Sequence, residues 1–252
     1  MTSAPPLALP GHPGRVRSMV VALCLGLMVG VHSDPVVAAA TVVAVAVSTT
    51  WRVRVCCAVV GTGMLLGVPW VILPAVAGGL WALWPRTVRV VPGILSSPRS
   101  RLSWALAAVG TGLVAGLLAW APLLRQLRTD PIVMDVVRPS TAVVVAAIIA
   151  MAMLNGTGEE LIWRGALSEV GASLPVPALF LVQAGSFGLA HLHGLPGGAV
   201  GVVLAAVFSL ACTALHLRAG LWVSVVAHIV ADLVIFAVAF PHVSFSGWWT
   251  PG

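Results

Sequence analysis

The segment Ser140–Gly165 reads STAVVVAAIIAMAMLNGTGEELIWRG. Its first part carries no charge up to Gly158, so a helix through it is long enough to cross most of a bilayer. Two adjacent carboxylates, Glu159 and Glu160, then follow, together with the guanidinium of Arg164. An ionised side chain near the bilayer centre costs about 2.5–3.5 kcal/mol or more, so such residues are usually paired, cavity-facing and functional. The segment therefore predicts both a membrane helix and a site of chemistry.

The composition of the whole chain is that of a membrane protein. Its 252 residues are 60% hydrophobic and 8% charged, with a mean hydropathy of +1.07, whereas about a quarter of the residues in soluble domains are charged. Five charge-free stretches are each long enough for one or more spanning helices: Pro35–Trp51, Val55–Pro85, Leu102–Leu124, Ser140–Gly158 and Val170–Leu217. We predict an all-α, polytopic transmembrane bundle of about eight spans in the cell membrane.

The basic residues are all arginines, and they give the chain a net charge of +6. They cluster between the apolar runs, which indicates topology signals rather than nucleic-acid binding. One basic loop precedes the run Leu102–Leu124 and another follows it, with the arginines Arg86, Arg89, Arg99, Arg101, Arg125, Arg128 and Arg138. Both loops cannot be cytoplasmic if that run crosses once, so the topology stays open.

We expect four parts along the chain: a cytoplasmic tail at 1–18, N-terminal transmembrane helices at 19–139, a catalytic core at 140–240 and a tail at 241–252. In the first half, Pro69 and Pro74 either separate two short helices or kink one long helix. The core is predicted as four consecutive helices: about Ser140–Val170, Val176–His193, Gly197–Leu217 and Leu221–Phe240.

The charged and imidazole side chains of the core fall at helical spacings. Glu160 and Arg164 are four residues apart with the acid first, so they can neutralise each other on one helix face. Glu159 points about 100° away and stays available as a general base. His191 ends its helix, and His228 shares a face with Asp232 one turn later on the last helix.

This set has a functional interpretation and a structural one. One acid and two histidines are enough to activate a water molecule, or to bind Zn²⁺ through Glu159, His191 and His228 with a fourth position open. Alternatively, the pair of Glu160 and Arg164 is a buried structural ion pair, and each histidine merely hydrogen-bonds a neighbouring helix. Because so many costly polar residues fall within a short part of the chain, the functional interpretation is favoured.

Three motifs carry a resemblance to a known family: GEELIWRG at Gly158–Gly165, FGLAH at Phe187–His191 and HIVAD at His228–Asp232. In order and spacing they resemble the motifs of the CAAX-protease and bacteriocin-processing family of intramembrane metalloproteases, also called the abortive-infection group. The resemblance covers roughly Ser140–Phe240. It implies a helical membrane protein that cleaves peptide bonds of membrane-embedded or membrane-tethered substrates.

By this resemblance, Glu159 and His191 would activate the water, and His228 with residue 232 would stabilise the oxyanion or complete a metal site. The family motif leaves open whether zinc is used. Position 232 is Asp where the family commonly has Asn, and an ionised Asp cannot donate to an oxyanion. Asp232 is therefore expected either to be protonated or to orient His228.

Two further functions compete with a protease. A proton-coupled transporter also places Glu, His and Asp in its spans, but it would favour matching polar positions in two repeated halves, which the sequence lacks. A non-catalytic immunity or scaffold protein would retain the fold without the chemistry. Either way, a chain of this composition meets its partners in or at the lipid bilayer.

Overall fold

The computed structural model describes residues 12–31, 33–48, 50–66, 72–82, 98–129, 133–134, 139–242 and 244–245. Helices account for nearly all of the elements in these ranges. They are α1 (His12–Gly30), α2 (Asp34–Val47), α3 (Trp51–Leu65), α4 (Ile72–Ala82), α5 (Pro98–Thr129), α6 (Thr141–Glu160), the π-helix η1 (Leu161–Ala166), α7 (Leu167–Val170), the 3₁₀ turn η2 (Gly171–Ser173), α8 (Val176–Ala190), α9 (Gly198–Ala219), α10 (Leu221–Ala239) and the 3₁₀ turn η3 (Phe240–His242). Two short strands, β1 (Val133–Met134) and β2 (Ser244–Phe245), pair in parallel.

The helices are long and apolar enough for a membrane. Among the described residues, four helical stretches meet the length and composition required to cross one: Arg101–Thr129, Thr141–Ser173, Gly198–Ala219 and Leu221–His242. Two shorter apolar helices are Asp34–Val47 and Val176–Ala190. Helices satisfy every backbone polar group internally, as a bilayer requires. The predicted all-α, multi-pass architecture is confirmed, while the total of about eight spans stays a prediction.

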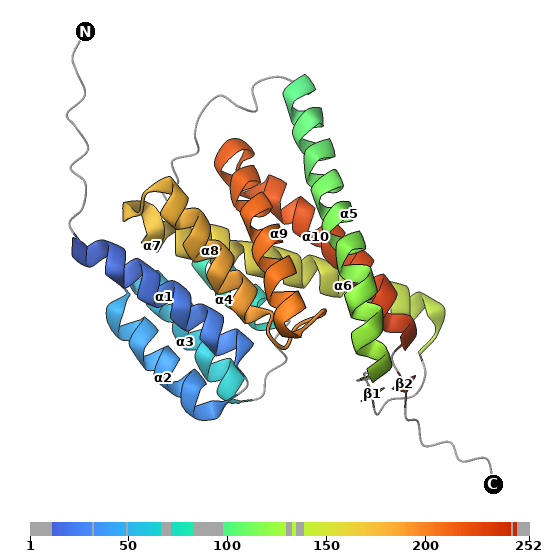
Figure 1. The fold of residues 1–252 in the computed structure, drawn as a ribbon, viewed down its shortest axis with the longest axis horizontal. Helices are drawn as coiled ribbons and strands as arrows, with labels where there is room; N and C mark the ends of the chain where they lie inside the picture. Colours follow the sequence, from blue (N-terminus) through green and yellow to red (C-terminus); the bar gives the residue numbers. More distant parts are fainter. Residues whose placement is uncertain are drawn as a thin grey trace.

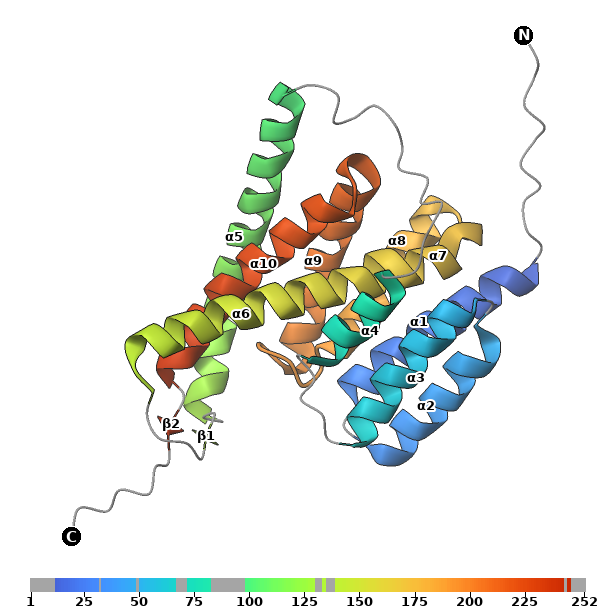
Figure 2. The same cartoon turned by 180° about the vertical axis from the view of Figure 1, so that it is seen from behind.

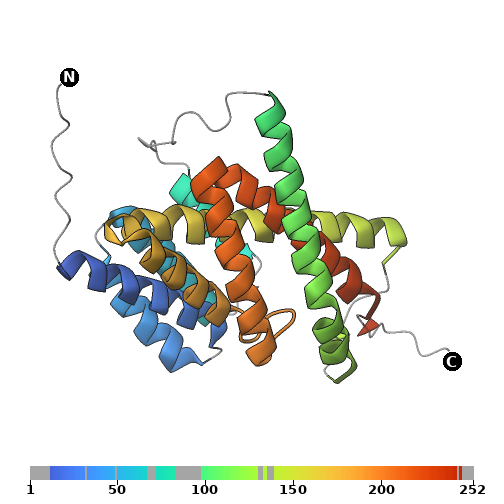
Figure 3. The ribbon, with the colours of Figure 1, turned by 45° about the horizontal axis from the view of Figure 1, so that its top comes forward.

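The helices form two groups joined by a long central helix. On one side, α1, α2 and α3 lie together, with α8 against α1 (Figure 1). On the other side, α5 packs along α10, and α9 lies between α8 and α10 (Figure 3). The view from behind shows α6 running across the molecule, with α4 packed on it (Figure 2). This arrangement places the end of α6, and thus the two glutamates, between the groups.

The four predicted core helices are present close to their expected bounds. The first is α6 continued by η1 and α7, and the other three are α8, α9 and α10. In the first half, Pro69 lies outside the described residues, but α3 and α4 are separate helices, and Pro74 falls in the first turn of α4. Proline is tolerated there because the first amides of a helix have no intrahelical partner. Of the two predicted alternatives, two separate short helices is therefore correct and one long kinked helix is not.

Two expected boundaries differ from the structure. Helix α1 begins at His12, inside the expected tail, and its proline, Pro13, occupies the first turn, where it costs no hydrogen bond. Arg99 and Arg101, expected in a connecting loop, lie instead at the start of α5. Arg86, Arg89 and Arg138 lie outside the described residues.

Two glycines near the end of α6 allow its neighbours to approach closely. A Cβ on Gly156 would lie 2.9 Å from the backbone nitrogen of Ile229 in α10. A Cβ on Gly158 would clash with the backbone of Pro74 and Ala75 in α4. Real Cβ atoms do not approach backbone this closely, so any larger residue would push α6 away from α10 or α4. The glycines therefore fix the position of the helix end that carries Glu159 and Glu160.

We expect Gly156→Ala to destabilise the protein by about 1–3 kcal/mol, the usual cost of overpacking, despite the higher helix propensity of alanine. The matched control is Gly185→Ala in α8, where a Cβ would meet no atom within 4 Å. This control should be neutral or slightly stabilising. Thermal unfolding in detergent measures both, and equal midpoints for the two variants would contradict the close approach.

Candidate active site

The centre of the site is a buried ion pair that holds three helices together. Arg164 Nη1 donates to Glu160 Oε1 at 2.8 Å, and both side chains are fully buried. The other terminal nitrogen of Arg164 donates to the carbonyl and the hydroxyl of Ser209 in α9 at 2.9 and 2.7 Å. The same Glu160 oxygen lies 2.9 Å from Nδ1 of His228 in α10. A buried charge is tolerated when it is paired and hydrogen-bonded, as here.

A π-helical turn follows the two glutamates and is bound by a buried amide. In η1 the backbone N–H of Leu167 bonds the carbonyl of Ile162, five residues earlier. The carbonyl of Trp163 accepts instead from Gln183 Nε2 in α8 at 2.8 Å, and the carbonyl group of Gln183 accepts from Thr213 in α9 at 2.7 Å. Such π-turns are rare and occur frequently at functional sites. Gln183 therefore fixes this turn against both neighbouring helices.

Glu159 faces a different direction from its neighbour, as the helix geometry predicts. Its Oε2 atom lies 3.5 Å from His228 Nε2 and 4.0 Å from His191 Nε2. The side chain is buried, and this oxygen makes no hydrogen bond to any described residue. The carboxylate is therefore next to both imidazoles but is not neutralised by the arginine that holds Glu160.

The partners of the Nδ1 atoms define which imidazole nitrogens face Glu159. His191 Nδ1 lies 2.8 Å from the carbonyl of Phe187, and His228 Nδ1 lies against the Glu160 carboxylate. Each Nδ1 must carry a proton to donate to these acceptors, so in neutral imidazoles each Nε2 is an acceptor. Three acceptors then converge, and a bound water molecule could donate to two of them at a time.

Phe187 packs against both histidines and the arginine. Its ring centroid lies 4.4 Å from that of His191 and 5.7 Å from that of His228, and the Arg164 guanidinium carbon lies 4.9 Å from the Phe187 centroid. Phe187 is almost completely buried. The contact between Phe187 and His191 follows from helix geometry, because the two residues lie one helical turn apart.

Asp232 completes the cluster and brings in a residue that the sequence interpretation did not single out. Asp232 Oδ1 lies 3.8 Å from His228 Nε2, as expected for a pair one turn apart. Its other oxygen, Oδ2, accepts from Asn155 Nδ2 at 3.0 Å. Asn155 is an amide within the apolar run of α6, one turn before Glu159. The occurrence of a polar amide within this apolar run is the sequence feature that could have identified Asn155 as a site residue.

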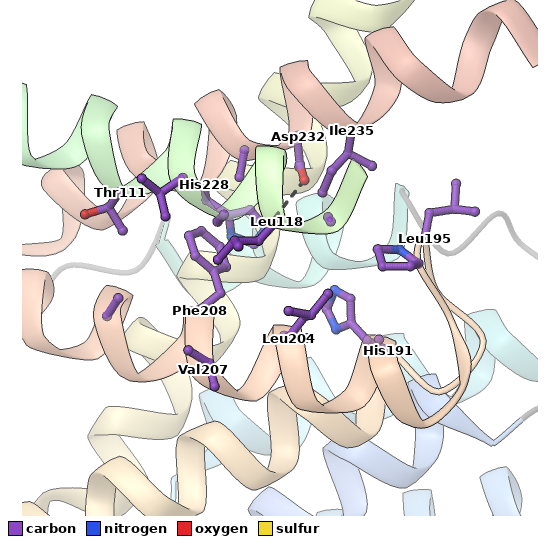
Figure 4. A pocket seen from close by; sticks show the side chains of 18 of the residues that line it. Thr111, Leu118, His191, Leu195, Leu204, Val207, Phe208, His228, Asp232 and Ile235 are labelled. Carbon is purple, nitrogen blue, oxygen red and sulfur yellow. Dashed lines mark ion pairs between the residues drawn. The ribbon is translucent and has the colours of Figure 1, made fainter. Parts of the chain in front are cut away.

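A cavity of about 510 Å³ adjoins this cluster. Figure 4 shows His191 at the end of α8 and, across the cavity, His228 and Asp232 on α10 beside Phe208. Asn155 lines the cavity as well, whereas Glu159 is not among the lining residues and lies next to the two imidazoles. The remaining walls come mainly from apolar residues of α5 and α9. The cavity therefore presents a polar end to an apolar chamber.

The structure thus brings together all six predicted site residues: Glu159, Glu160, Arg164, His191, His228 and Asp232. Their catalytic roles stay predictions. Ser186 of α8 accepts from Trp163 Nε1 and donates to the Ala22 carbonyl. Its hydroxyl is therefore a packing link between helices.

The predicted zinc ligands have suitable chemistry, since carboxylate oxygen and imidazole nitrogen both bind Zn²⁺. Within the described part of the chain, however, no group of three or more His, Cys, Asp or Glu side chains is arranged to hold a metal ion. Zinc binding by Glu159, His191 and His228 stays a prediction.

Removing one partner of the buried pair should be more harmful than removing both. Arg164→Ala leaves Glu160 buried without its arginine, and such changes cost about 3–5 kcal/mol. The double variant Glu160→Leu with Arg164→Leu should lose less stability because no charge stays unpaired. Thermal unfolding in detergent compares the two. A double variant less stable than Arg164→Ala would contradict the importance of charge balance.

The comparisons with known proteins agree with the three motifs. No curated protein and no solved structure matched the chain. Residues 141–234, which contain all six site residues, match the family model described as type II CAAX prenyl endopeptidase Rce1-like. The part of this membrane protein that carries the candidate site is therefore similar to Rce1-like endopeptidases, in agreement with the resemblance of its motifs.

Proposed function

We propose that the protein is an intramembrane endopeptidase of the CAAX-protease type that hydrolyses peptide bonds of membrane-associated substrates. The observation that carries the proposal is the placement of Glu159. Its Oε2 atom is buried, lacks a hydrogen bond among the described residues, and lies beside two imidazoles that line the cavity. A carboxylate kept free in this way next to a cavity suits a general base.

The reaction begins with a water molecule held by Glu159 and His191. One water proton is directed at Glu159 Oε2 and the other at His191 Nε2, which leaves a lone pair for the scissile carbonyl carbon. Glu159 takes a proton as the water oxygen bonds to that carbon. It then returns the proton to the leaving nitrogen as the C–N bond breaks, and the products are a carboxylic acid and an amine, between which a proton passes to give a carboxylate and an ammonium group.

His228 is placed to stabilise the oxyanion that forms in between. When doubly protonated, it donates from Nδ1 to Glu160 and from Nε2 to the oxyanion. Asp232 Oδ1, 3.8 Å from that Nε2, helps to hold the positive charge and the ring orientation. Glu160 and Arg164 serve as the fixed support of His228 rather than as reacting groups.

The cavity suits a peptide that carries an apolar group. Its apolar walls include Leu118, Leu204 and Val207, while the polar end is formed by His191 and His228. A lipidated or strongly apolar substrate can place its hydrophobic part against α5 and α9 and its peptide bond at the imidazoles. We further propose that the protein acts in the cell membrane, where such substrates are embedded or tethered.

We expect Glu159→Gln to lower the cleavage rate by about 10²–10⁴-fold, the usual contribution of a general base, while leaving thermal stability nearly unchanged. The probe is a quenched fluorogenic peptide that ends in an S-farnesylated Cys-aliphatic-aliphatic-Met box. The control, Glu169→Gln, removes the acid of α7, which does not line the cavity, and should cleave normally. Full activity of the Glu159→Gln variant would contradict the proposal.

The zinc prediction is tested separately by elemental analysis. If Glu159 activates the water without a metal, as in the reaction proposed above, the protein binds less than one equivalent of zinc and cleavage survives a chelator. One equivalent in the wild type that disappears from the double variant His191→Ala with His228→Ala would instead assign zinc to these histidines.

A further inference from the structure

Asn155 combines features that a purely structural amide would not need. It is 3% exposed, lies on apolar α6 and lines the cavity. Its Nδ2 donates to Asp232, but its Oδ1 is buried without a hydrogen-bond partner in the described part of the chain. Buried polar atoms nearly always have a partner, so an unpaired one calls for an explanation. Here the cavity is where a partner can enter.

Asp232 determines which end of the amide is left free. An ionised carboxylate accepts hydrogen bonds but cannot donate them, so it selects Nδ2 as the contacting group. The Oδ1 atom is then the end of the amide that stays available. An asparagine at position 232 could accept or donate and would not impose this orientation. The departure from the commoner family residue therefore has a physical consequence at Asn155.

The spacing along α6 relates this acceptor to the reacting bond. Asn155 and Glu159 are one turn apart on the same face, about 6 Å along the helix axis. An extended peptide advances about 3.3 Å per residue. A backbone N–H that reaches Asn155 would thus belong to a residue about two positions from the bond attacked beside Glu159.

We propose that Asn155 is a substrate-binding residue: its Oδ1 atom accepts a hydrogen bond from a substrate backbone N–H about two residues from the scissile bond, while Asp232 holds the amide in place. This inference rests on the proposed peptidase function. It assigns the site to a peptide backbone, which supplies N–H donors whatever its side chains are. The contact therefore aligns the chain without selecting a particular sequence.

The experiment measures binding, so that it does not depend on turnover. The protein carries Glu159→Gln to prevent cleavage and is placed in lipid nanodiscs. The probes are a fluorescent S-farnesylated peptide with the Cys-aliphatic-aliphatic-Met box and three analogues, each with one backbone N–H of the box replaced by an ester oxygen. Fluorescence anisotropy gives the dissociation constant of each.

With Asn155 present, we expect one of the three ester replacements to weaken binding by about 3- to 10-fold, as a single lost hydrogen bond does. In Asn155→Ala this same replacement should have no effect, because its partner is already absent. The swap Asn155→Asp with Asp232→Asn keeps both the pair and a free acceptor, and should keep the penalty. Thr111→Val, which removes another polar group lining the cavity, should also keep it.

Three results would overturn the inference: no ester replacement weakens binding, the penalty persists in Asn155→Ala, or no probe binds at all. The swap guards against a variant that fails to fold, since it restores the pairing of amide and carboxylate. Failure of the peptidase proposal has a different signature. In that case the probe binds and shows the Asn155-dependent penalty, but the wild-type protein does not cleave it.

Discussion

The structure depends on the need to balance charge inside an apolar bundle. Arg164 satisfies Glu160 and also bonds Ser209 on α9, while Glu160 reaches His228 on α10. Because an unpaired charge in this environment is very costly, these contacts determine how α6, α9 and α10 meet. The same contacts fix the imidazole of His228 in the orientation that faces Glu159. The contacts that balance the buried charges therefore also set the geometry of the site.

Adjacent glutamates can have opposite roles because neighbouring helix positions point about 100° apart. Glu160 Oε1 is bonded by both Arg164 and His228, whereas Glu159 Oε2 has no hydrogen-bond partner among the described residues. An unpaired buried acceptor lowers stability, and a protein held together well elsewhere can tolerate that loss. The close packing at Gly156 and the pair of Glu160 and Arg164 supply this stability. In the proposed reaction, the unpaired Oε2 atom of Glu159 is one place where stability is given up for reactivity.

The spacing of residues along single helices predicted much of the site. It could not predict contacts between residues that are far apart in the sequence. The pairs Glu160 with Arg164 and His228 with Asp232 follow from one helical turn, and the apolar runs located the core helices. The bond from Asn155 to Asp232 joins residues 77 positions apart, and no spacing rule connects them. The π-turn η1 depends on Gln183 of another helix, so local propensity did not reveal it. The expected start of α1 was late because proline and glycine, typical of tails, are also tolerated in a first helical turn.

The segment 141–234, which matches the Rce1-like model, does not contain everything that positions the candidate site. His191 lies at the end of α8, and Ser186 of that helix donates to the Ala22 carbonyl of α1, outside residues 141–234. The loop after His191 is held by Gln126 of α5, which accepts from the Gly197 amide at 2.8 Å and donates to the Gly194 carbonyl at 3.3 Å. Helix α5 also forms one wall of the cavity. Since the distance from His191 to Glu159 depends on where α8 ends, the N-terminal helices contribute to the geometry of the site as well as to its enclosure.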